Sequence, residues 1–266
     1  MLNIRKYGRK PYKTAVIHGG PGAQGELAPV ARELSSLNGI LEPLQTGISV
    51  KEQLRELKTA IEKYGDWPVT LIGFSWGAWL SFMAAAKYPR LVKKLLLVGS
   101  GPFESKYAGK ITAARLRRLS TGEQAEFRAI TQMLDNAGVK NNRQALERLG
   151  ELCSKTDSYS PIKQKPEKID CKTQIFKKVW REASELRRSG KLLRLGADIS
   201  CPVIAIHGDY DPHPAQGVRK PLSGVIRNFR FITLRRCGHK PWIERKAKDE
   251  FYRIVKKEIS PNSSVE

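Results

Sequence analysis

The sequence predicts an α/β protein with a mostly parallel, twisted sheet flanked by helices and with an inserted helical cap. Apolar, β-prone runs alternate with amphipathic runs up to residue 102, and the alternation resumes at residue 198. Such alternation is typical of parallel sheets. The intervening residues read as several helices without a convincing strand. We therefore expect a core domain of residues 1–102 and 198–266, and a helical cap of residues 103–197.

Composition is typical of a globular protein. The chain has 266 residues, 40% of them hydrophobic, which suffices for one α/β domain with an insertion. No stretch approaches the roughly 20 apolar residues of a membrane span, and residues 1–14 lack the apolar centre of a signal peptide. The four cysteines are scattered without a CxxC pair. We expect a cytoplasmic protein with reduced thiols and no structural zinc.

The charge is strongly positive, at +22. Basic residues are interleaved with acidic ones along the whole chain, and there is no basic block, RNA-binding signature or zinc finger. We therefore expect a generally cationic surface and no specific nucleic-acid partner. The predicted cap holds 21 Lys or Arg against 11 Asp or Glu. This excess indicates a solvated outer face or, alternatively, recognition of an anionic substrate.

The first part of the chain reads as alternating strands and helices. In order, the expected elements are a short edge hairpin around Gly8, a strand at 14–17, a helix at 26–37, a strand at 40–44 and a helix between Ser49 and Gly65. The first helix is predicted by apolar side chains at helical spacing, Leu27, Val30, Leu34 and Leu37. The second begins with a capping box formed by Ser49 and Glu52.

The remaining elements continue the same pattern on either side of the cap. They are a strand from Val69 and its following helix to Tyr88, a strand at 94–98, cap helices near 111–119, 122–136, 143–153 and 174–188, strands at 201–206 and 229–234, and a last helix at 244–259. Pro89 ends the helix that follows Val69. A polar segment with prolines, residues 155–172, divides the cap helices.

A serine lies between a buried strand and a helix in the sequence GFSWG, residues 73–77. Where a strand enters a helix without a loop, the middle residue is driven to positive φ and its flanking positions nearly touch. Gly73 and Gly77 satisfy that demand. The turn would hold the Ser75 hydroxyl at the sheet edge, and the Trp76 N–H would begin a helix, where a developing oxyanion is stabilised. We expect Ser75 to be a nucleophile.

Polar motifs follow three other predicted strands. HGGPG occupies residues 18–22, HGDYDPH occupies residues 207–213, and CGH occupies residues 237–239. A carboxylate at the carboxyl end of a strand lies where open α/β sheets hold their sites. Of the four histidines, His239 lies on the loop after the last strand, which makes it the strongest candidate for a general base.

The spacing H-x-D-x-D-x-H in residues 207–213 also suggests a metal site. Alternate residues leaving a strand point to opposite faces, so these four side chains are not expected to converge. We therefore predict no metal.

Together these motifs resemble the α/β-hydrolase superfamily over nearly the full chain, and the combination is most similar to the proline iminopeptidase branch. That resemblance implies an α/β-hydrolase fold with a helical cap. It also implies a serine hydrolase that forms an acyl-enzyme without a metal or organic cofactor.

The resemblance also implies the roles of individual residues. Ser75, Asp211 and His239 follow the family's chain order of nucleophile, acid and base. Asp211 matches the family spacing G-x-x-D, and Asp209 is the alternative acid. The oxyanion hole would consist of the Gly20 and Trp76 N–H groups, while His18 braces the loop. We expect Phe103 and Trp242, together with the Trp76 ring, to form apolar walls of the substrate pocket.

Four functions fit this reading. The first is hydrolysis of a small ester, amide or N-terminal peptide bond, with a small molecule or short peptide as substrate. The alternatives are a proline iminopeptidase proper, an acyltransferase or carbon–carbon bond hydrolase with the same triad, and a non-catalytic ligand-binding member of the fold.

Overall fold

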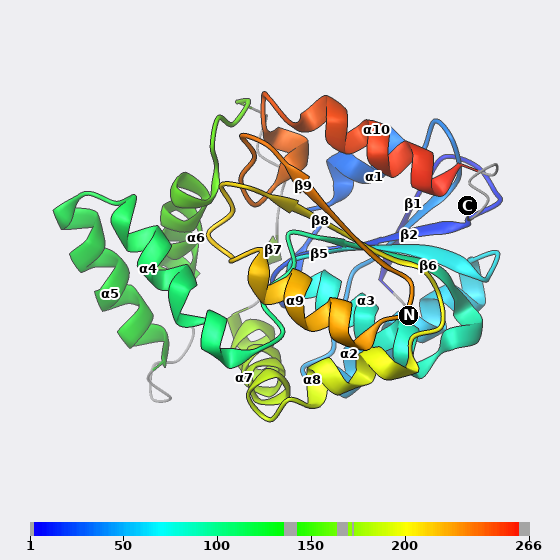
Figure 1. Ribbon diagram of the computed structural model, residues 1–266, viewed down its shortest axis with the longest axis horizontal. Coiled ribbons are helices and arrows are strands. Elements are labelled where there is room, and N and C mark those ends of the chain that lie inside the picture. The colour runs from blue at the N-terminus through cyan, green and yellow to red at the C-terminus, as the bar shows by residue number, and fades with distance from the viewer. Residues whose placement is uncertain (1–2, 136–142, 164–169, 172, 261–266) are drawn as a thin grey trace.

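A seven-stranded sheet forms the centre of the computed structural model (Figure 1), which describes residues 3–135, 143–163, 170–171 and 173–260. In spatial order the strands are β1 (Ile4–Tyr7), β4 (Ile40–Pro43), β2 (Thr14–Ile17), β5 (Val69–Phe74), β6 (Val92–Val98), β8 (Val203–Gly208) and β9 (Phe229–Leu234). All neighbours are parallel except β1 and β4. The predicted mostly parallel sheet is confirmed.

The expected N-terminal hairpin is wrong. Strand β1 pairs with β4 in antiparallel register, with Ile4 opposite Pro43, and β4 separates it from β2. The Tyr7 hydroxyl donates a 2.7 Å hydrogen bond to the buried carboxylate of Glu42. This contact and the strand pairing place β1 at the sheet edge beside β4.

Helices cover both faces of the sheet (Figure 1). One face carries α1 (Ala28–Leu34) and α10 (Lys248–Ile259), and the other carries α2 (Val50–Tyr64), α3 (Trp76–Lys87), α8 (Lys191–Arg194) and α9 (Gln216–Val225). Strand residues alternate between two buried clusters. On β6, Leu95 and Leu97 pack with the α2–α3 side, whereas Leu96 and Val98 pack with the α1–α10 side. Each such burial contributes about 1.5–3 kcal/mol.

The first two helices differ in how well the sequence predicts their ends. Helix α2 begins as expected, because the Ser49 hydroxyl accepts a 3.2 Å hydrogen bond from the Glu52 N–H. Helix α1 ends at Leu34, earlier than expected, and Leu37 is 47% exposed. Leu37 therefore lies outside the helical stripe that predicted it.

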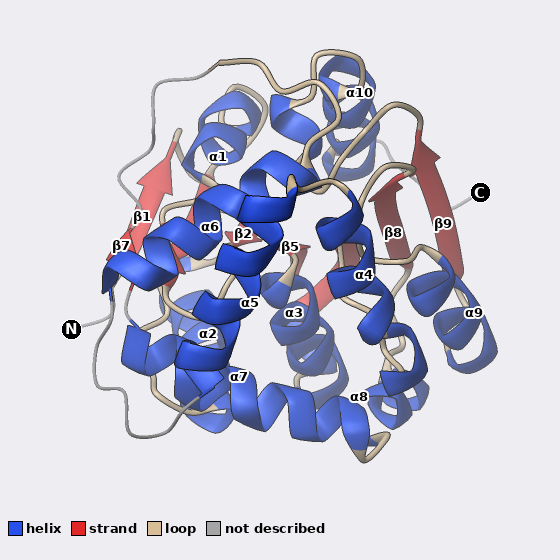
Figure 2. Cartoon of the chain, turned by 90° about the vertical axis from the view of Figure 1, so that its left-hand side faces the viewer, coloured by secondary structure: helices blue, strands red, loops and turns tan. Residues whose placement is uncertain are grey.

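Between β6 and β8 the described residues are largely helical. The long helices are α4 (Gly109–Arg117), α5 (Thr121–Asp135), α6 (Arg143–Asp157) and α7 (Thr173–Arg188). Helices α5 and α6 share a small core of their own, Leu119, Phe127, Ile130, Ala145 and Leu152. Seen from the side in Figure 2, α4, α5 and α6 lie in front of the strands. Helix α7 instead contributes Ile175, Val179 and Ala183 to the core beneath α3.

One element of this region departs from the expectation that it holds no strand. Residues Asp170–Cys171 form the short strand β7, which pairs with β3 (Ala23–Gln24) in a separate antiparallel sheet. The pairing is only two residues long, and such a short strand has no periodic pattern from which the sequence could predict it. No helix of the described part of the chain is long and apolar enough to cross a membrane.

Candidate active site

Ser75 occupies a strained turn between β5 and α3. It is a non-glycine residue with φ 52° and ψ −113°, and its N–H donates a 2.9 Å hydrogen bond to the Val98 carbonyl. A positive φ is unfavourable for a residue with a Cβ, so the surrounding structure must hold it. The hydrogen bond to β6 and the first turn of α3 provide this support.

Two glycines allow that turn. A Cβ on Gly73 would lie 2.2 Å from the Gly77 carbonyl oxygen, and a Cβ on Gly77 would lie 2.2 Å from the Ile17 carbonyl oxygen. Real side chains do not approach backbone this closely, so neither position accepts one. The spacing GxSxG therefore reflects direct contact between α3, β5 and the end of β2.

The two expected oxyanion donors lie at the beginning of α3 and in the loop after β2. Trp76 is the first residue of α3, where the backbone N–H has no partner within the helix. Its indole instead lies in the core and donates a 3.0 Å hydrogen bond to Gln53. Gly20 has φ 44°, and its carbonyl accepts a hydrogen bond from the Ala23 N–H.

His18 lies in the same loop and is completely buried. Its Nδ1 donates a 2.8 Å hydrogen bond to the Gly19 carbonyl, and burial lowers the pKa of His18. A neutral, buried imidazole bonded to the loop backbone agrees with the expected bracing role.

Asp211 and His239 are in direct contact. Asp211 Oδ2 lies 2.8 Å from His239 Nδ1, and both side chains are buried. Asp209, the alternative acid, accepts a 3.1 Å hydrogen bond from the Cys237 N–H instead. Burial would raise the pKa of Asp211, but the histidines that face it hold this pKa well below its usual value. The Asp211 carboxylate is therefore ionised at neutral pH and accepts a hydrogen bond. His239 Nδ1 carries the hydrogen and donates it to Asp211 Oδ2.

His239 lies at the same end of the sheet as Ser75. Its ring packs on Phe74, the residue before Ser75, with centroids 4.8 Å apart. It also lies close to Gly99 at the end of β6, since a Cβ there would be 3.1 Å from His239 Nδ1. The ends of β5, β9 and β8 thus bring the serine, the imidazole and the carboxylate to one edge of the sheet, where the His239 ring lies close to Gly99 after β6.

Two further histidines face Asp211, and sequence reasoning did not assign them. His213 Nδ1 lies 2.8 Å from Asp211 Oδ1, and His207 Nε2 lies 3.6 Å from Asp211 Oδ2. As expected, the four side chains of the motif do not all converge, because Asp209 binds the Cys237 N–H, but His207, Asp211 and His213 do come together. Strand β8 ends at Gly208, and the chain then turns, so strand alternation no longer governs residues 211 and 213. The H-x-D-x-D-x-H pattern itself was the available signal.

Asp211, His213 and His239 are also the group of possible metal ligands among the described residues, with donor atoms within 4.8 Å of one another. Two imidazoles and a carboxylate match zinc by donor type. Here, however, each carboxylate oxygen already accepts a hydrogen bond from an imidazole. The cluster is complete as a hydrogen-bonded unit.

A segment after α6 is fastened to the loop that carries His239. The His239 N–H donates a 2.7 Å hydrogen bond to the Asp157 carbonyl. The buried carboxylate of Glu244 accepts hydrogen bonds from the N–H groups of Gly238, Tyr159 and Ser160. Gly238 is required here, because a Cβ would lie 2.1 Å from the Asp157 carbonyl oxygen.

The expected pocket residues Phe103 and Trp242 are buried in the two core clusters. Phe103 packs against Phe82 and Trp79, and Trp242 packs edge-on against Phe74. Trp242 thus contacts Phe74, which in turn packs on the His239 ring, whereas Phe103 lies in the core beside α3.

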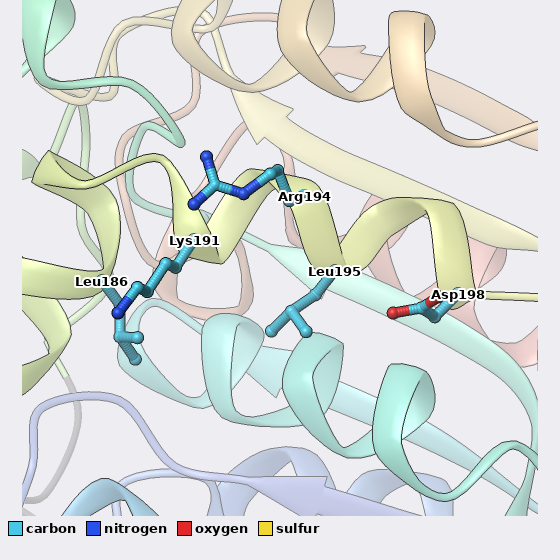
Figure 3. A pocket seen from close by; sticks show the side chains of 5 residues that line it. All are labelled: Leu186, Lys191, Arg194, Leu195 and Asp198. Carbon is cyan, nitrogen blue, oxygen red and sulfur yellow. The ribbon is translucent and has the colours of Figure 1, made fainter.

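Two depressions lie elsewhere on the surface. One, of about 380 Å³, is lined by Leu186, Lys191, Arg194, Leu195 and Asp198 (Figure 3). A second, of about 950 Å³, shares part of this lining and extends to Val50 on α2 and Met83 on α3. Ser75, Asp211 and His239 line neither of them.

Comparison with known proteins gives a family and a fold. A sequence model of the alpha/beta hydrolase fold family matches residues 19–245. No curated protein matches the chain in sequence.

Several crystal structures are similar over nearly the full chain. VinJ has a TM-score of 0.70 at 15% identity, covering 96% of this chain and 93% of VinJ. The proline iminopeptidase of Mycobacterium smegmatis has a TM-score of 0.61 at 16% identity, with coverage of 96% and 93%. The Paleococcus ferrophilus monoacylglycerol lipase has a TM-score of 0.59 at 15% identity, with coverage of 97% and 98%. At these identities the likeness concerns the fold.

Proposed function

Because the chain belongs to the α/β-hydrolase fold family, we propose that it is a serine hydrolase in which Ser75, His239 and Asp211 form a catalytic triad. The observation that carries this proposal is the 2.8 Å contact between Asp211 and His239 beside a serine with positive φ. A strained serine next to a buried carboxylate–imidazole pair has the parts that nucleophilic acyl transfer needs.

In the proposed reaction, the Ser75 hydroxyl attacks the substrate carbonyl while His239 Nε2 takes its proton. Asp211 holds His239 in the tautomer with the hydrogen on Nδ1 and stabilises the imidazolium. The N–H groups of Trp76 and Gly20 stabilise the oxyanion. His239 then gives the proton to the leaving group, and water hydrolyses the acyl-enzyme by the same steps. No metal or organic cofactor takes part in this scheme.

We further propose a small ester or amide without a free amine as the substrate. Within the described part of the chain, the acidic side chains Asp157, Glu26 and Glu244 near the site already have partners. Asp157 binds Arg115 in a two-point ion pair, and Glu26 lies 2.7 Å from Lys240. The Glu244 carboxylate accepts hydrogen bonds from three backbone N–H groups. This arrangement favours an esterase or amidase over an aminopeptidase, which needs a carboxylate to hold an ammonium group.

A fluorophosphonate probe tests the nucleophile. We expect labelling of the wild-type protein at Ser75 and none of Ser75→Ala. Ser100→Ala is the matched control, because Ser100 lies in the loop after the neighbouring strand β6 and its hydroxyl donates to the Gly101 carbonyl; this variant should label normally. A folded wild-type protein that the probe does not label would refute the proposal.

A pair of substrates tests the specificity. The p-nitrophenyl esters of alanine and N-acetylalanine share the ester and the side chain, and the acetyl group of the second removes the free amine. We expect kcat/KM for the acetylated ester to equal or exceed that for the free amine. A preference of more than tenfold for the free amine would favour an aminopeptidase instead.

A further inference from the structure

Asp211 holds two imidazoles at once. His213 Nδ1 lies 2.8 Å from Asp211 Oδ1, and His239 Nδ1 lies 2.8 Å from Asp211 Oδ2. An ionised carboxylate accepts hydrogen bonds and donates none, so each ring carries its hydrogen on Nδ1. A neutral ring of this tautomer has its lone pair on Nε2. The triad proposed above uses one of these rings and leaves the other without a role.

His213 is held in place as firmly as a triad member. Its N–H donates a 2.9 Å hydrogen bond to Asp211 Oδ1, and its carbonyl accepts a 2.7 Å hydrogen bond from His207 Nε2. Pro212 and Pro214 flank it and restrict its backbone. The His213 ring stacks on His239, with centroids 4.4 Å apart and planes 22° apart.

Building on the proposed triad, we propose that His213 is a positioning residue for the reaction. Its Nδ1–H and N–H fix one oxygen of Asp211, and its ring supports one face of His239. The other oxygen of Asp211 and the Nε2 of His239 are then held in the orientation that proton transfer from Ser75 needs.

The electrostatics of the cluster agree with this role. The titratable and charged groups around His213 are Asp211, His207 and His239, and the Arg115–Asp157 pair from α4 and α6. Burial lowers the pKa of His213 to about 4, against the opposing effect of Asp211. At neutral pH His213 is therefore uncharged and does not compete with the His239 imidazolium for the single negative charge of Asp211.

Two substitutions separate the hydrogen bond from the ring. His213→Asn keeps an N–H donor in the place of Nδ1 and loses the ring, whereas His213→Phe keeps a stacking ring and loses the donor. We expect each to lower kcat for a p-nitrophenyl ester about five- to tenfold. In His213→Phe the Asp211 carboxylate loses the hydrogen bond from His213 Nδ1, so its negative charge stabilises the His239 imidazolium more strongly. The acid limb of kcat/KM should therefore move to higher pH by about one unit. In His213→Asn the limb should stay near that of the wild type.

A purely structural residue would give a different pattern. It would lower the melting temperature or yield and leave kcat of the folded fraction and the acid limb unchanged. An unmoved limb and a kcat within twofold of wild type for His213→Phe would overturn the proposal. Should that variant fail to fold, a kcat of His213→Asn within twofold of wild type overturns it equally.

Histidine NMR decides the same point without turnover. The wild-type protein and His213→Phe are labelled with ¹⁵N in histidine, and the chemical shift of the His239 ring nitrogens is followed as the pH is varied. We expect its midpoint to move to higher pH in the variant, and an unmoved midpoint contradicts the coupling. If the fluorophosphonate leaves the wild type unlabelled, the triad fails, and this titration still reports whether His213 acts on His239 through Asp211.

Discussion

The turn at Ser75 depends on two residues that have no side chain. Gly77 lies over the end of β2, where a Cβ would come 2.2 Å from the Ile17 carbonyl oxygen and 2.5 Å from that of His18. Both atoms are backbone and belong to the strand end that leads to Gly20. The absence of a Cβ at Gly77 therefore affects the positions of both Ser75, the proposed nucleophile, and Gly20, the proposed oxyanion donor.

We expect Gly77→Ala to destabilise the protein by about 3 kcal/mol, because the methyl group must displace backbone in a packed core. Urea unfolding followed by circular dichroism measures this. Gly122→Ala, in the first turn of α5, is the matched control, since no atom lies within 4 Å of its added Cβ. It should be neutral or stabilising by up to about 1 kcal/mol. Equal unfolding midpoints for the two variants would show that the Gly77 contact is not tight.

Asp211 and Asp209 differ in their partners and so in their expected importance. Asp211→Asn removes the charge that stabilises the His239 imidazolium and disturbs its tautomer, and we expect kcat to fall roughly 10³–10⁴-fold. Asp209→Asn keeps the oxygen that accepts the Cys237 N–H, so its effect should stay below about tenfold. Hydrolysis of a p-nitrophenyl ester measures both. Similar losses in the two variants would contradict the choice of Asp211 as the acid.

At the scale of elements, α10 is joined to the sheet by a buried ion pair. Glu258 lies 3.0 Å from Lys94 on β6 and also binds Arg230 on β9. Burial raises the pKa of Glu258, but Lys94 and Arg230 together lower it below its ordinary value. A carboxylate with a lowered folded-state pKa stabilises the fold above its unfolded pKa, and this contribution is lost as pH falls through the folded one.

Glu258→Gln should therefore lower the free energy of unfolding by about 1–2 kcal/mol at pH 7. The difference from wild type should shrink as the pH falls below about 4. Urea unfolding at a series of pH values measures it. Glu62→Gln, in the exposed pair with Lys58 on α2, should change stability by less than about 0.5 kcal/mol. A difference for Glu258→Gln that persists unchanged to acid pH would refute the assignment.

Strands and amphipathic helices were predictable where one physical signal dominates. Strand β9 and the start of α2 match the expectation, because a run rich in aromatic and β-branched residues and a capping box leave few alternatives. Helix α9 was missed, since Pro221 within it masks its periodicity. The partner of β1 was wrong, because a strand of two half-buried and two exposed residues does not identify its neighbour.

The candidate site shows the same limit. Sequence spacing pointed to Ser75, Asp211 and His239, and the last two are in contact. The place of His213 depends on the turn after β8, and pattern reasoning treated that segment as an extended strand. Contacts made by a turn are decided by its dihedral angles, which residue spacing alone does not give.

At the scale of the whole molecule, the helical region and the sheet meet at the His239 loop. Backbone hydrogen bonds join residues 157–162 to residues 239–245, and Glu244 lies between the two segments. Its carboxylate accepts three hydrogen bonds from backbone N–H groups, two on the first segment and one from Gly238 just before the second. At this corner the helical region is hydrogen-bonded directly to the His239 loop.

Glu244→Ala should thus destabilise both the segment at residues 157–162 and the loop that carries His239. It leaves three backbone N–H groups without their acceptor, which should cost about 3 kcal/mol in unfolding free energy and lower esterase activity more than tenfold as His239 loses its support. Limited proteolysis should cut faster near residues 157–162, and mass spectrometry of the fragments locates the cut. Glu250→Ala, on the outer side of α10, is the control and should behave as wild type. If cleavage in Glu244→Ala stays at the wild-type rate while activity falls, Glu244 acts on the histidine loop alone and the two regions are not coupled through it.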